Sequence, residues 1–228
     1  MVKLIQDKDN YTLCVLKNDS HISSWVEQHR SMVTDQTVTL HILPMIKAGD
    51  TVVDVGANIG THTVQYAKAV GETGKVLAFE PYVPSFICLA VNTRDLPQVE
   101  LFNSALGAES CKGSVIAPKD TNMGMASVVK DNNGLTLVYP LDDLNLESCA
   151  FIKIDVEGSE PDAIKGAMET IKRCQPVLFV ELNDTTLEKH GYTKDSVLKP
   201  LMDIGYQYSF VDPCHSLHET QLDVILKP

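Results

Sequence analysis

Acidic residues follow two of the short apolar segments that we expect to be buried strands. Asp155 and Glu157 come directly after Phe151–Ile154, and Glu181 ends the apolar run at 177–181. Carboxylates can act as general bases, and they are the ligands that hard cations such as Mg²⁺ prefer. Because the carboxyl ends of parallel strands meet at one edge of a sheet, these side chains are expected to converge on a single cleft.

A glycine-containing turn follows another apolar segment, Thr51–Val55, and precedes a helical pattern. Glycine lets a backbone approach a ligand closely, and the following helix start offers free N–H groups. A dinucleotide fingerprint needs a glycine where Asn58 stands, so the spacing disfavours NAD and FAD. Taken alone, the turn could also be an ordinary tight turn with a buried aspartate. The residues expected to bind a cofactor here are Asp54, Gly56, Ala57, Asn58, Gly60 and Thr61.

Glu80 follows the second expected strand, Lys75–Phe79, about 20 residues after Gly60. In nucleotide-binding sheets an acid at this place accepts hydrogen bonds from the ribose hydroxyls. Alternatively, Glu80 complements the dipole of the helix that starts near Pro81. Pro81 is also expected to contact the cofactor. The third strand, Val99–Phe102, is expected to end beside the adenine. The residues expected to border the adenine are Asn103, Ser104 and Ala105.

These residues need a scaffold, and the apolar pattern of the chain predicts one. Buried strands are expected at 51–55, 75–79, 99–102, 151–154 and 177–181, and helices at about 62–69, 83–92, 160–172 and 194–202. Ser159 and Asp162 have the spacing of a capping box at the start of the third helix. Short strands alternating with helices predict an α/β fold with a doubly wound, mostly parallel, Rossmann-like sheet. Segments 206–211 and 221–226 predict an antiparallel C-terminal hairpin.

The expected domain organisation is one catalytic domain over 49–228, preceded by an extension over 1–48 that packs on it as a cap. The extension is expected to contain a helix at about 37–46. Between 106 and 146, alternating segments separated by Gly and Asn predict a β-hairpin insertion that covers the site. Met123 and Met125 in this insertion are either adaptable acceptor contacts or ordinary packing residues.

The turn after 51–55 and the sequence Phe79-Glu80-Pro81 resemble those of class I S-adenosylmethionine-dependent methyltransferases. Together with Lys-Ile-Asp-Val-Glu-Gly-x-Glu at 153–160 and Val-Glu-Leu-Asn at 180–183, the pattern is similar to that of the FkbM family. The resemblance implies S-adenosyl-L-methionine as cofactor and an O-methyltransferase acting on a hydroxyl of a small molecule, sugar or glycan.

Methyl transfer to a hydroxyl requires alignment of the reacting atoms and removal of a proton. We expect Asp155 or Glu157 to be the base, with Glu181 shaping the acceptor pocket. Alternatively, the three carboxylates hold Mg²⁺. Two other functions compete: a non-catalytic S-adenosylmethionine-binding protein and a nicotinamide-dependent oxidoreductase, the latter disfavoured by Asn58.

The composition constrains the partners of the protein. The formal net charge is −11 and no segment is rich in Lys or Arg, which disfavours a nucleic-acid substrate. No apolar run approaches the roughly 20 residues that a membrane span needs. The acidic N-terminus lacks the pattern of a signal peptide, and six scattered cysteines without a C-x-x-C pair favour reduced thiols. We therefore expect a cytoplasmic protein.

Overall fold

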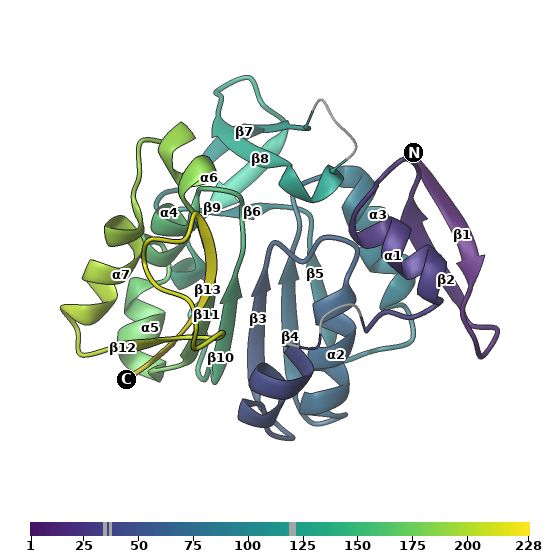
Figure 1. Cartoon of the computed structure of the whole chain (residues 1–228), viewed down its shortest axis with the longest axis horizontal. Coiled ribbons are helices and arrows are strands. Elements are labelled where there is room, and N and C mark those ends of the chain that lie inside the picture. Colours follow the sequence, from purple (N-terminus) through teal and green to yellow (C-terminus); the bar gives the residue numbers. More distant parts are fainter. Residues whose placement is uncertain (34–35, 37, 119–121) are drawn as a thin grey trace.

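A seven-stranded sheet forms the centre of the molecule in the computed structural model, which describes residues 1–33, 36, 38–118 and 122–228 (Figure 1). The strands in spatial order are β12 (Gln207–Phe210), β13 (Gln221–Lys227), β11 (Val177–Asn183), β10 (Phe151–Ile154), β3 (Thr51–Val55), β4 (Lys75–Phe79) and β5 (Val99–Phe102). From β11 to β5 all neighbours are parallel, whereas β13 is antiparallel to β11 and β12. The predicted α/β sheet with an antiparallel C-terminal pair is confirmed.

Helices cover both faces of this sheet because successive strand residues point to opposite sides. On one face, α2 (Thr61–Val70) packs with the helical turns η1 (Val38–Ile42) and η2 (Leu43–Met45), and α3 (Val83–Asn92) packs beside them. The other face is covered by α4 (Glu160–Lys165), α5 (Met168–Cys174), α6 (Asp184–Lys189) and α7 (Lys194–Met202). Among the described residues, no helix has the length and apolar character needed to span a bilayer.

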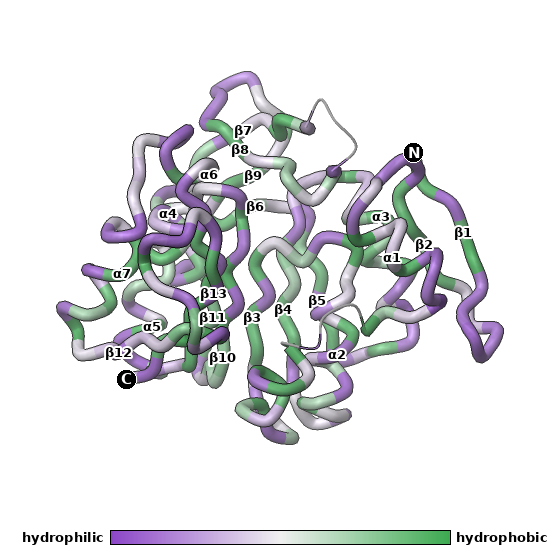
Figure 2. The backbone as a smooth tube through the Cα atoms, viewed as in Figure 1, coloured by the Kyte–Doolittle hydropathy of each residue, from purple (hydrophilic) through white to green (hydrophobic). Residues whose placement is uncertain are grey.

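The central strands are apolar on both faces, as expected for strands buried between two helical layers. Figure 2 shows β3 and β4 as mainly hydrophobic, whereas hydrophilic residues concentrate in the connections and at the ends of the sheet. Two charged residues interrupt this core: Asp54 of β3 is fully buried, and Lys153 of β10 is 2% exposed. Buried charges require partners, and these two residues lie directly beneath the candidate site.

The N-terminal segment packs against α3. Strands β1 (Val2–Gln6) and β2 (Thr12–Leu16) form an antiparallel hairpin, followed by α1 (Ile22–His29). The buried side chain of Asn92 accepts a hydrogen bond from the Cys14 amide at 2.7 Å and donates to the carbonyls of Cys14 and Ile59 at 2.9 and 2.7 Å. A single side chain thus connects the N-terminal hairpin, α3 and the glycine turn.

A second, smaller sheet lies above the carboxyl ends of the central strands (Figure 1). Its four strands, in the order β6-β9-β7-β8, are β6 (Ala105–Leu106), β9 (Thr136–Tyr139), β7 (Cys111–Ile116) and β8 (Ser127–Lys130). The short helical turn η3 (Met123–Met125) precedes β8 and lies next to the N-terminal segment.

Three local predictions differ from the structure. The helix expected at 160–172 is two helices, because Asp142 accepts hydrogen bonds from the Glu169 and Thr170 amides and so starts α5 separately. Ser159 forms no side-chain cap, because a Glu160 oxygen accepts the local amides instead. The helix expected at 37–46 consists of η1 and η2, and its first residue lies outside the described part of the chain.

Candidate active site

A cavity of about 610 Å³ lies at the carboxyl ends of the parallel strands, below the second sheet. This is the position at which doubly wound sheets bind their ligands. The structure brings together at this cavity most of the residues predicted from the sequence. Those that line it are Gly56, Asn58, Glu80, Pro81, Ser104, Ala105, Asp155, Glu157 and Glu181.

The glycine turn is held in close contact with the end of β10. Gly56 has a φ of +82°, and a Cβ placed on it would lie 1.8 Å from the carbonyl oxygen of Asp155, so no other residue fits. The amide of Asn58 donates to a carboxylate oxygen of Glu80 at 2.8 Å, and the Tyr82 amide donates to the other oxygen at 2.7 Å. Glu80 thereby supports the turn while it faces the cavity.

Burial of Glu80 raises its pKa to about 7, although its two backbone hydrogen bonds favour the charged form. The acid is therefore held in a desolvated position with each oxygen already oriented by an amide. A carboxylate fixed in this way can accept further hydrogen bonds from vicinal hydroxyls.

Five of the predicted cofactor residues are not among those that line the cavity: Asp54, Ala57, Gly60, Thr61 and Asn103. Asp54 lies beneath the turn and accepts a 2.5 Å hydrogen bond from Thr63 of α2. Asn103 donates to the Glu80 carbonyl at 2.8 Å, and Gly60 is the residue before α2. These residues therefore lie in or next to the turn, on the side away from the cavity.

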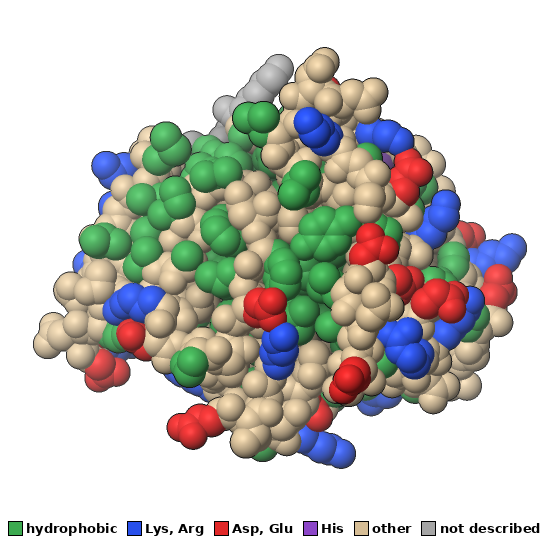
Figure 3. Space-filling model, turned by 180° about the vertical axis from the view of Figure 1, so that it is seen from behind, with side chains coloured by type: hydrophobic (Ala, Val, Ile, Leu, Met, Phe, Trp, Pro, Cys, Tyr) green, Lys and Arg blue, Asp and Glu red, His purple; other side chains and the backbone are tan. Residues whose placement is uncertain are grey.

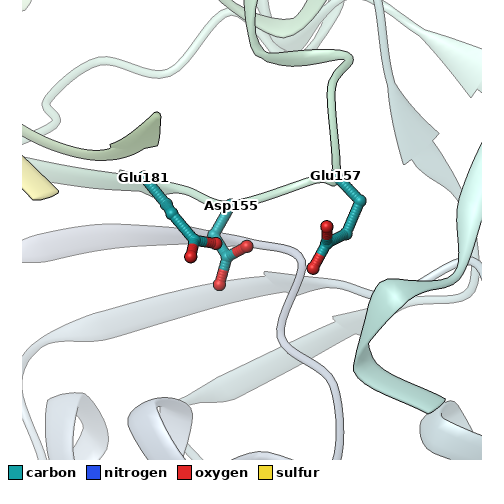
Figure 4. Close-up of side chains that lie close together, drawn as sticks. All are labelled: Asp155, Glu157 and Glu181. Atoms are coloured by element: carbon teal, nitrogen blue, oxygen red, sulfur yellow. The ribbon is translucent and has the colours of Figure 1, made fainter. Parts of the chain in front are cut away.

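Asp155, Glu157 and Glu181 converge as predicted, with one oxygen of each carboxylate within 4.8 Å of the others. In Figure 4, Asp155 and Glu181 lie side by side, and Glu157 extends towards the same space from the loop that follows β10. Glu181 comes from β11 and accepts a hydrogen bond from the side-chain amide of Gln221. The cluster therefore combines one residue of β11 with two from the loop that follows the neighbouring strand β10.

Lys153 is the buried cation of this cluster. Its ammonium donates to the Gly56 carbonyl at 2.7 Å and lies 3.3 Å from Asp155 and 3.6 Å from Asp54. Burial alone would lower the pKa of Lys153, but the carboxylates of Asp155 and Asp54 raise it above its usual value. The lysine is therefore charged, and it connects the glycine turn to the acidic cluster.

The proton affinities of Asp155 and Glu181 differ strongly. Burial disfavours the ionised form of Asp155, yet the ammonium of Lys153 and a hydrogen bond with Glu181 hold its pKa below the ordinary value. The negative charge of Asp155, followed by burial, raises the pKa of Glu181 to about 10. At neutral pH, Asp155 is thus the ionised member of the pair and Glu181 holds a proton.

Glu157 has an unusual backbone conformation. Its φ of +57° lies in the left-handed region, which a residue with a side chain adopts at a cost of about 1–2 kcal/mol. Gly158 follows with a φ of +105°, and a Cβ there would lie 2.3 Å from the Thr186 carbonyl oxygen. The Glu160 carboxylate accepts hydrogen bonds from the Val156 and Gly158 amides at 3.1 Å each. The loop is thus held in the shape that places Glu157 in the cavity.

Burial raises the pKa of Glu157 to about 8, and the charges of Asp155 and Glu160 add to this effect. A pKa near neutrality suits a general base, which must release and take up a proton under working conditions. Residues in a cavity that have a strained backbone conformation or a shifted pKa are typical of functional sites.

Reasoning from sequence missed several residues of the cavity. His21 and Ile22 line it from the N-terminal segment, and Gln221 lines it from β13. Nothing in the local sequence at 21–22 indicates this role, because only the tertiary packing brings the segment there. Lys153 did carry a signal, since it is the one charge in the four-residue apolar strand Phe151–Ile154.

The spacing of the three carboxylates is compatible with a divalent cation. Within the same group, the Lys153 ammonium lies 3.3 Å from Asp155. The magnesium site stays a prediction.

Comparison with known proteins identifies the family. The Methyltransferase FkbM domain matches residues 54–208, which is more than half of the chain. A comparison with curated proteins found no match.

Three similar solved structures share the fold. The methyltransferase FkbM from Methylobacillus flagellatus KT is 19% identical, with a TM-score of 0.52 over 78% of this chain, which spans 43% of that protein. A putative rRNA methylase from Clostridium thermocellum is 16% identical, with a TM-score of 0.55 over 82% of this chain and 90% of that one. Fibrillarin from Aeropyrum pernix, in complex with natively bound S-adenosyl-L-methionine, is 14% identical, with a TM-score of 0.53 over 99% of this chain and 93% of that one.

The family match coincides with the cavity, because residues 54–208 contain the glycine turn, Glu80 and the three carboxylates. The resemblance seen in the sequence is confirmed. The chain belongs to the FkbM methyltransferase family and has the fold of S-adenosylmethionine-dependent methyltransferases.

Proposed function

We propose that this protein transfers the methyl group of S-adenosyl-L-methionine to a hydroxyl oxygen of a small molecule, sugar or glycan. The observation that carries the proposal is the placement of Glu157 and its neighbouring carboxylates in the same cavity as the glycine turn and Glu80. One side of the cavity thus offers hydroxyl-binding and backbone groups for a nucleoside, and the other offers acceptors for a proton.

On the cofactor side, the Glu80 carboxylate would accept hydrogen bonds from the ribose hydroxyls, and the turn at Gly56 and Asn58 would hold the amino-acid part of the donor. Ser104 and Ala105 line the cavity after β5, where the adenine is expected. Asp155, kept ionised by Lys153, provides a negative charge beside the cationic donor.

On the acceptor side, the structure favours Glu157 over Asp155 as general base. Asp155 is paired with Lys153 and has a lowered pKa, which makes it a weak base. Glu157 has a pKa of about 8, and its charged form can take up the hydroxyl proton as the oxygen attacks the methyl carbon. Glu181, oriented by Gln221, lies beside them and contacts the acceptor.

The charge of the surface supports a small or glycan acceptor. The formal net charge is −11, and on the face shown in Figure 3, basic side chains are scattered among acidic ones without a continuous basic surface. Binding of nucleic acid depends on such a surface, since phosphate neutralisation provides much of the affinity. A small or glycan acceptor suits this charge distribution better, although some proteins of the same fold are described as rRNA methylases.

Calorimetric titration with S-adenosylhomocysteine tests the cofactor assignment. The wild type is expected to bind it at micromolar concentration and Glu80→Ala to lose at least about tenfold in affinity, since two charge-assisted hydrogen bonds are removed. NAD is the control ligand and is expected not to bind. Binding of NAD instead of S-adenosylhomocysteine would favour an oxidoreductase and contradict the proposal.

Methyl transfer to a panel of hydroxyl acceptors, measured with wild type and Glu157→Gln, tests the base. The variant is expected to lose about 10²- to 10⁴-fold in kcat with unchanged S-adenosylhomocysteine affinity. The wild-type rate is expected to rise with pH as Glu157 ionises near its pKa of about 8. Addition of EDTA is expected to leave the rate unchanged, whereas a loss restored by Mg²⁺ would establish the metal alternative. Tight cofactor binding without turnover on any acceptor would indicate a non-catalytic protein.

A further inference from the structure

Part of the cavity wall comes from two segments that lie far apart in the sequence. His21 and Ile22 of the N-terminal segment line the cavity, and so do Met123 and Gly124 of the turn η3. We infer that Asp19, which lies next to the first of these segments, is a positioning residue that joins both into one wall of the cofactor cavity. This inference rests on the proposed function and extends it to the N-terminal segment.

The carboxylate of Asp19 bonds to both segments. One oxygen accepts a hydrogen bond from the Ser23 amide at 2.7 Å, which fixes the start of α1. The other accepts from the Met123 amide at 3.2 Å, across 104 positions of the chain, and from the His21 amide at 3.4 Å. Asp19 is only 6% exposed, and a buried carboxylate is stabilised only where such donors replace its lost hydration. Its position is therefore fixed by these three contacts.

The turn that Asp19 holds lies directly over the glycine turn. A Cβ placed on Gly124 would lie 3.5 Å from the side-chain nitrogen of Asn58, so a methyl group added there would touch Asn58 and the two turns lie close together. Met123 packs in the same apolar cluster as Ile59 of the glycine turn and Val26 of α1. Asp19 thus provides a polar contact to the segment over the cofactor turn, and Met123 provides an apolar one.

A merely structural role for Asp19 can be separated from this positioning role, because the chain contains a matched residue. Asp142 also accepts two backbone hydrogen bonds from a distant segment, from Thr170 at 2.7 Å and Glu169 at 3.0 Å. It fixes the start of α5 and is not among the residues that line the cavity. Removal of the Asp142 carboxylate frees two amides and removal of the Asp19 carboxylate frees three, and of these two residues only Asp19 connects residues of the wall.

The test compares Asp19→Ala and Asp142→Ala in the full chain by thermal unfolding and by calorimetric titration with S-adenosylhomocysteine. Both variants are expected to melt at lower temperature. Asp19→Ala is expected to bind S-adenosylhomocysteine at least about tenfold more weakly, because the wall is no longer held against the turn, and Asp142→Ala to stay within about twofold of wild type. Asp19→Asn keeps one oxygen acceptor, so its affinity for S-adenosylhomocysteine is expected to lie between those of Asp19→Ala and Asp142→Ala. If Asp19→Ala does not fold, Asp19→Asn replaces it in both measurements.

Amide hydrogen exchange of the unliganded protein provides a readout that is independent of the cofactor. Exchange over 122–126 is expected to accelerate in the Asp19 variant and to stay as in wild type in Asp142→Ala. Unchanged affinity and unchanged exchange in the Asp19 variant would overturn the inference. Failure of the wild type to bind S-adenosylhomocysteine would overturn the proposed function instead, and the exchange result would still decide whether Asp19 holds the turn.

Discussion

Two buried lysines show how the same side chain is used differently in two regions of this molecule. Lys153 on β10 is 2% exposed and Lys194 on α7 is 7% exposed. The ammonium of Lys153 contacts the carboxylates of Asp54 and Asp155 and the Gly56 carbonyl. That of Lys194 contacts one carboxylate, of Asp184, and two backbone carbonyls in the loop before β13.

The difference lies in what surrounds each cation. Two of the three partners of Lys194 are carbonyl groups, which do not titrate, and they lie in a loop that its ammonium holds. The partners of Lys153 belong to a cluster in which Asp155 and Glu181 share one proton, so its charge decides which carboxyl is ionised. A buried ion pair is weak evidence for stability by itself. The ion pair of Lys153 has a second effect, because it lies at the site and influences which carboxyl group of the cavity is ionised.

The largest effect is expected for Lys153→Met. Breaking a buried charge pair from one side costs about 3–5 kcal/mol of unfolding free energy, because the partner charges remain buried. Since Asp54 and Asp155 flank the glycine turn, we also expect S-adenosylhomocysteine affinity to fall below detection. Denaturant unfolding and calorimetry measure the two effects, and Lys153→Arg, which keeps the charge, should restore part of both.

Lys194→Met should separate stability from function. We expect a loss of about 1–3 kcal/mol, because two carbonyls lose their donor while the Asp184 carboxylate can still be hydrated. S-adenosylhomocysteine affinity should remain within about twofold of wild type. An equal loss of affinity in both lysine variants would show that the cavity responds to general destabilisation and not to the charge of Lys153 in particular.

The dependence of stability on pH should also differ between the two lysine variants. The pKa values of Glu80, Glu157 and Glu181 are raised from 4.5 to about 7, 8 and 10, so the folded protein keeps protons that the unfolded chain releases. Stability of the unliganded protein should therefore fall as pH rises from about 5 to 8, by at most about 1.4 kcal/mol per pH unit for each group. The fall should be steeper in Lys153→Met and unchanged in Lys194→Met. Melting temperatures over this range measure it, and parallel curves for the two variants would contradict the assignment.

The smallest effect is expected for Asp184→Asn. The side chain of Asp184 is 40% exposed, and ion pairs at such positions contribute about 1 kcal/mol or less. Chemical denaturation should show this small loss together with wild-type S-adenosylhomocysteine affinity. A loss above about 2 kcal/mol would mean that Lys194 depends on this carboxylate more than on the two carbonyls.

The sheet and most of the site could be predicted from the sequence, because their signals are local. Apolar runs mark the central strands, and the residues after each run, such as Gly56, Glu80 and Asp155, necessarily meet at one edge. What could not be predicted depends on contacts across the chain. The break between α4 and α5 is set by Asp142, and the place of His21 in the wall is set by packing of the N-terminal segment.

The position of β13 has a consequence for the order in which the molecule is completed. Although it is the last strand in the chain, it inserts between β11 and β12, and its first residue, Gln221, orients Glu181. Proteins are synthesised from the N-terminus, so the glycine turn and Glu80 are made well before this strand. The residues proposed to hold the donor are thus all made before Gln221, which orients Glu181. A chain that ends before β13 therefore contains the proposed donor side of the cavity but lacks the residue that orients the proposed acceptor side.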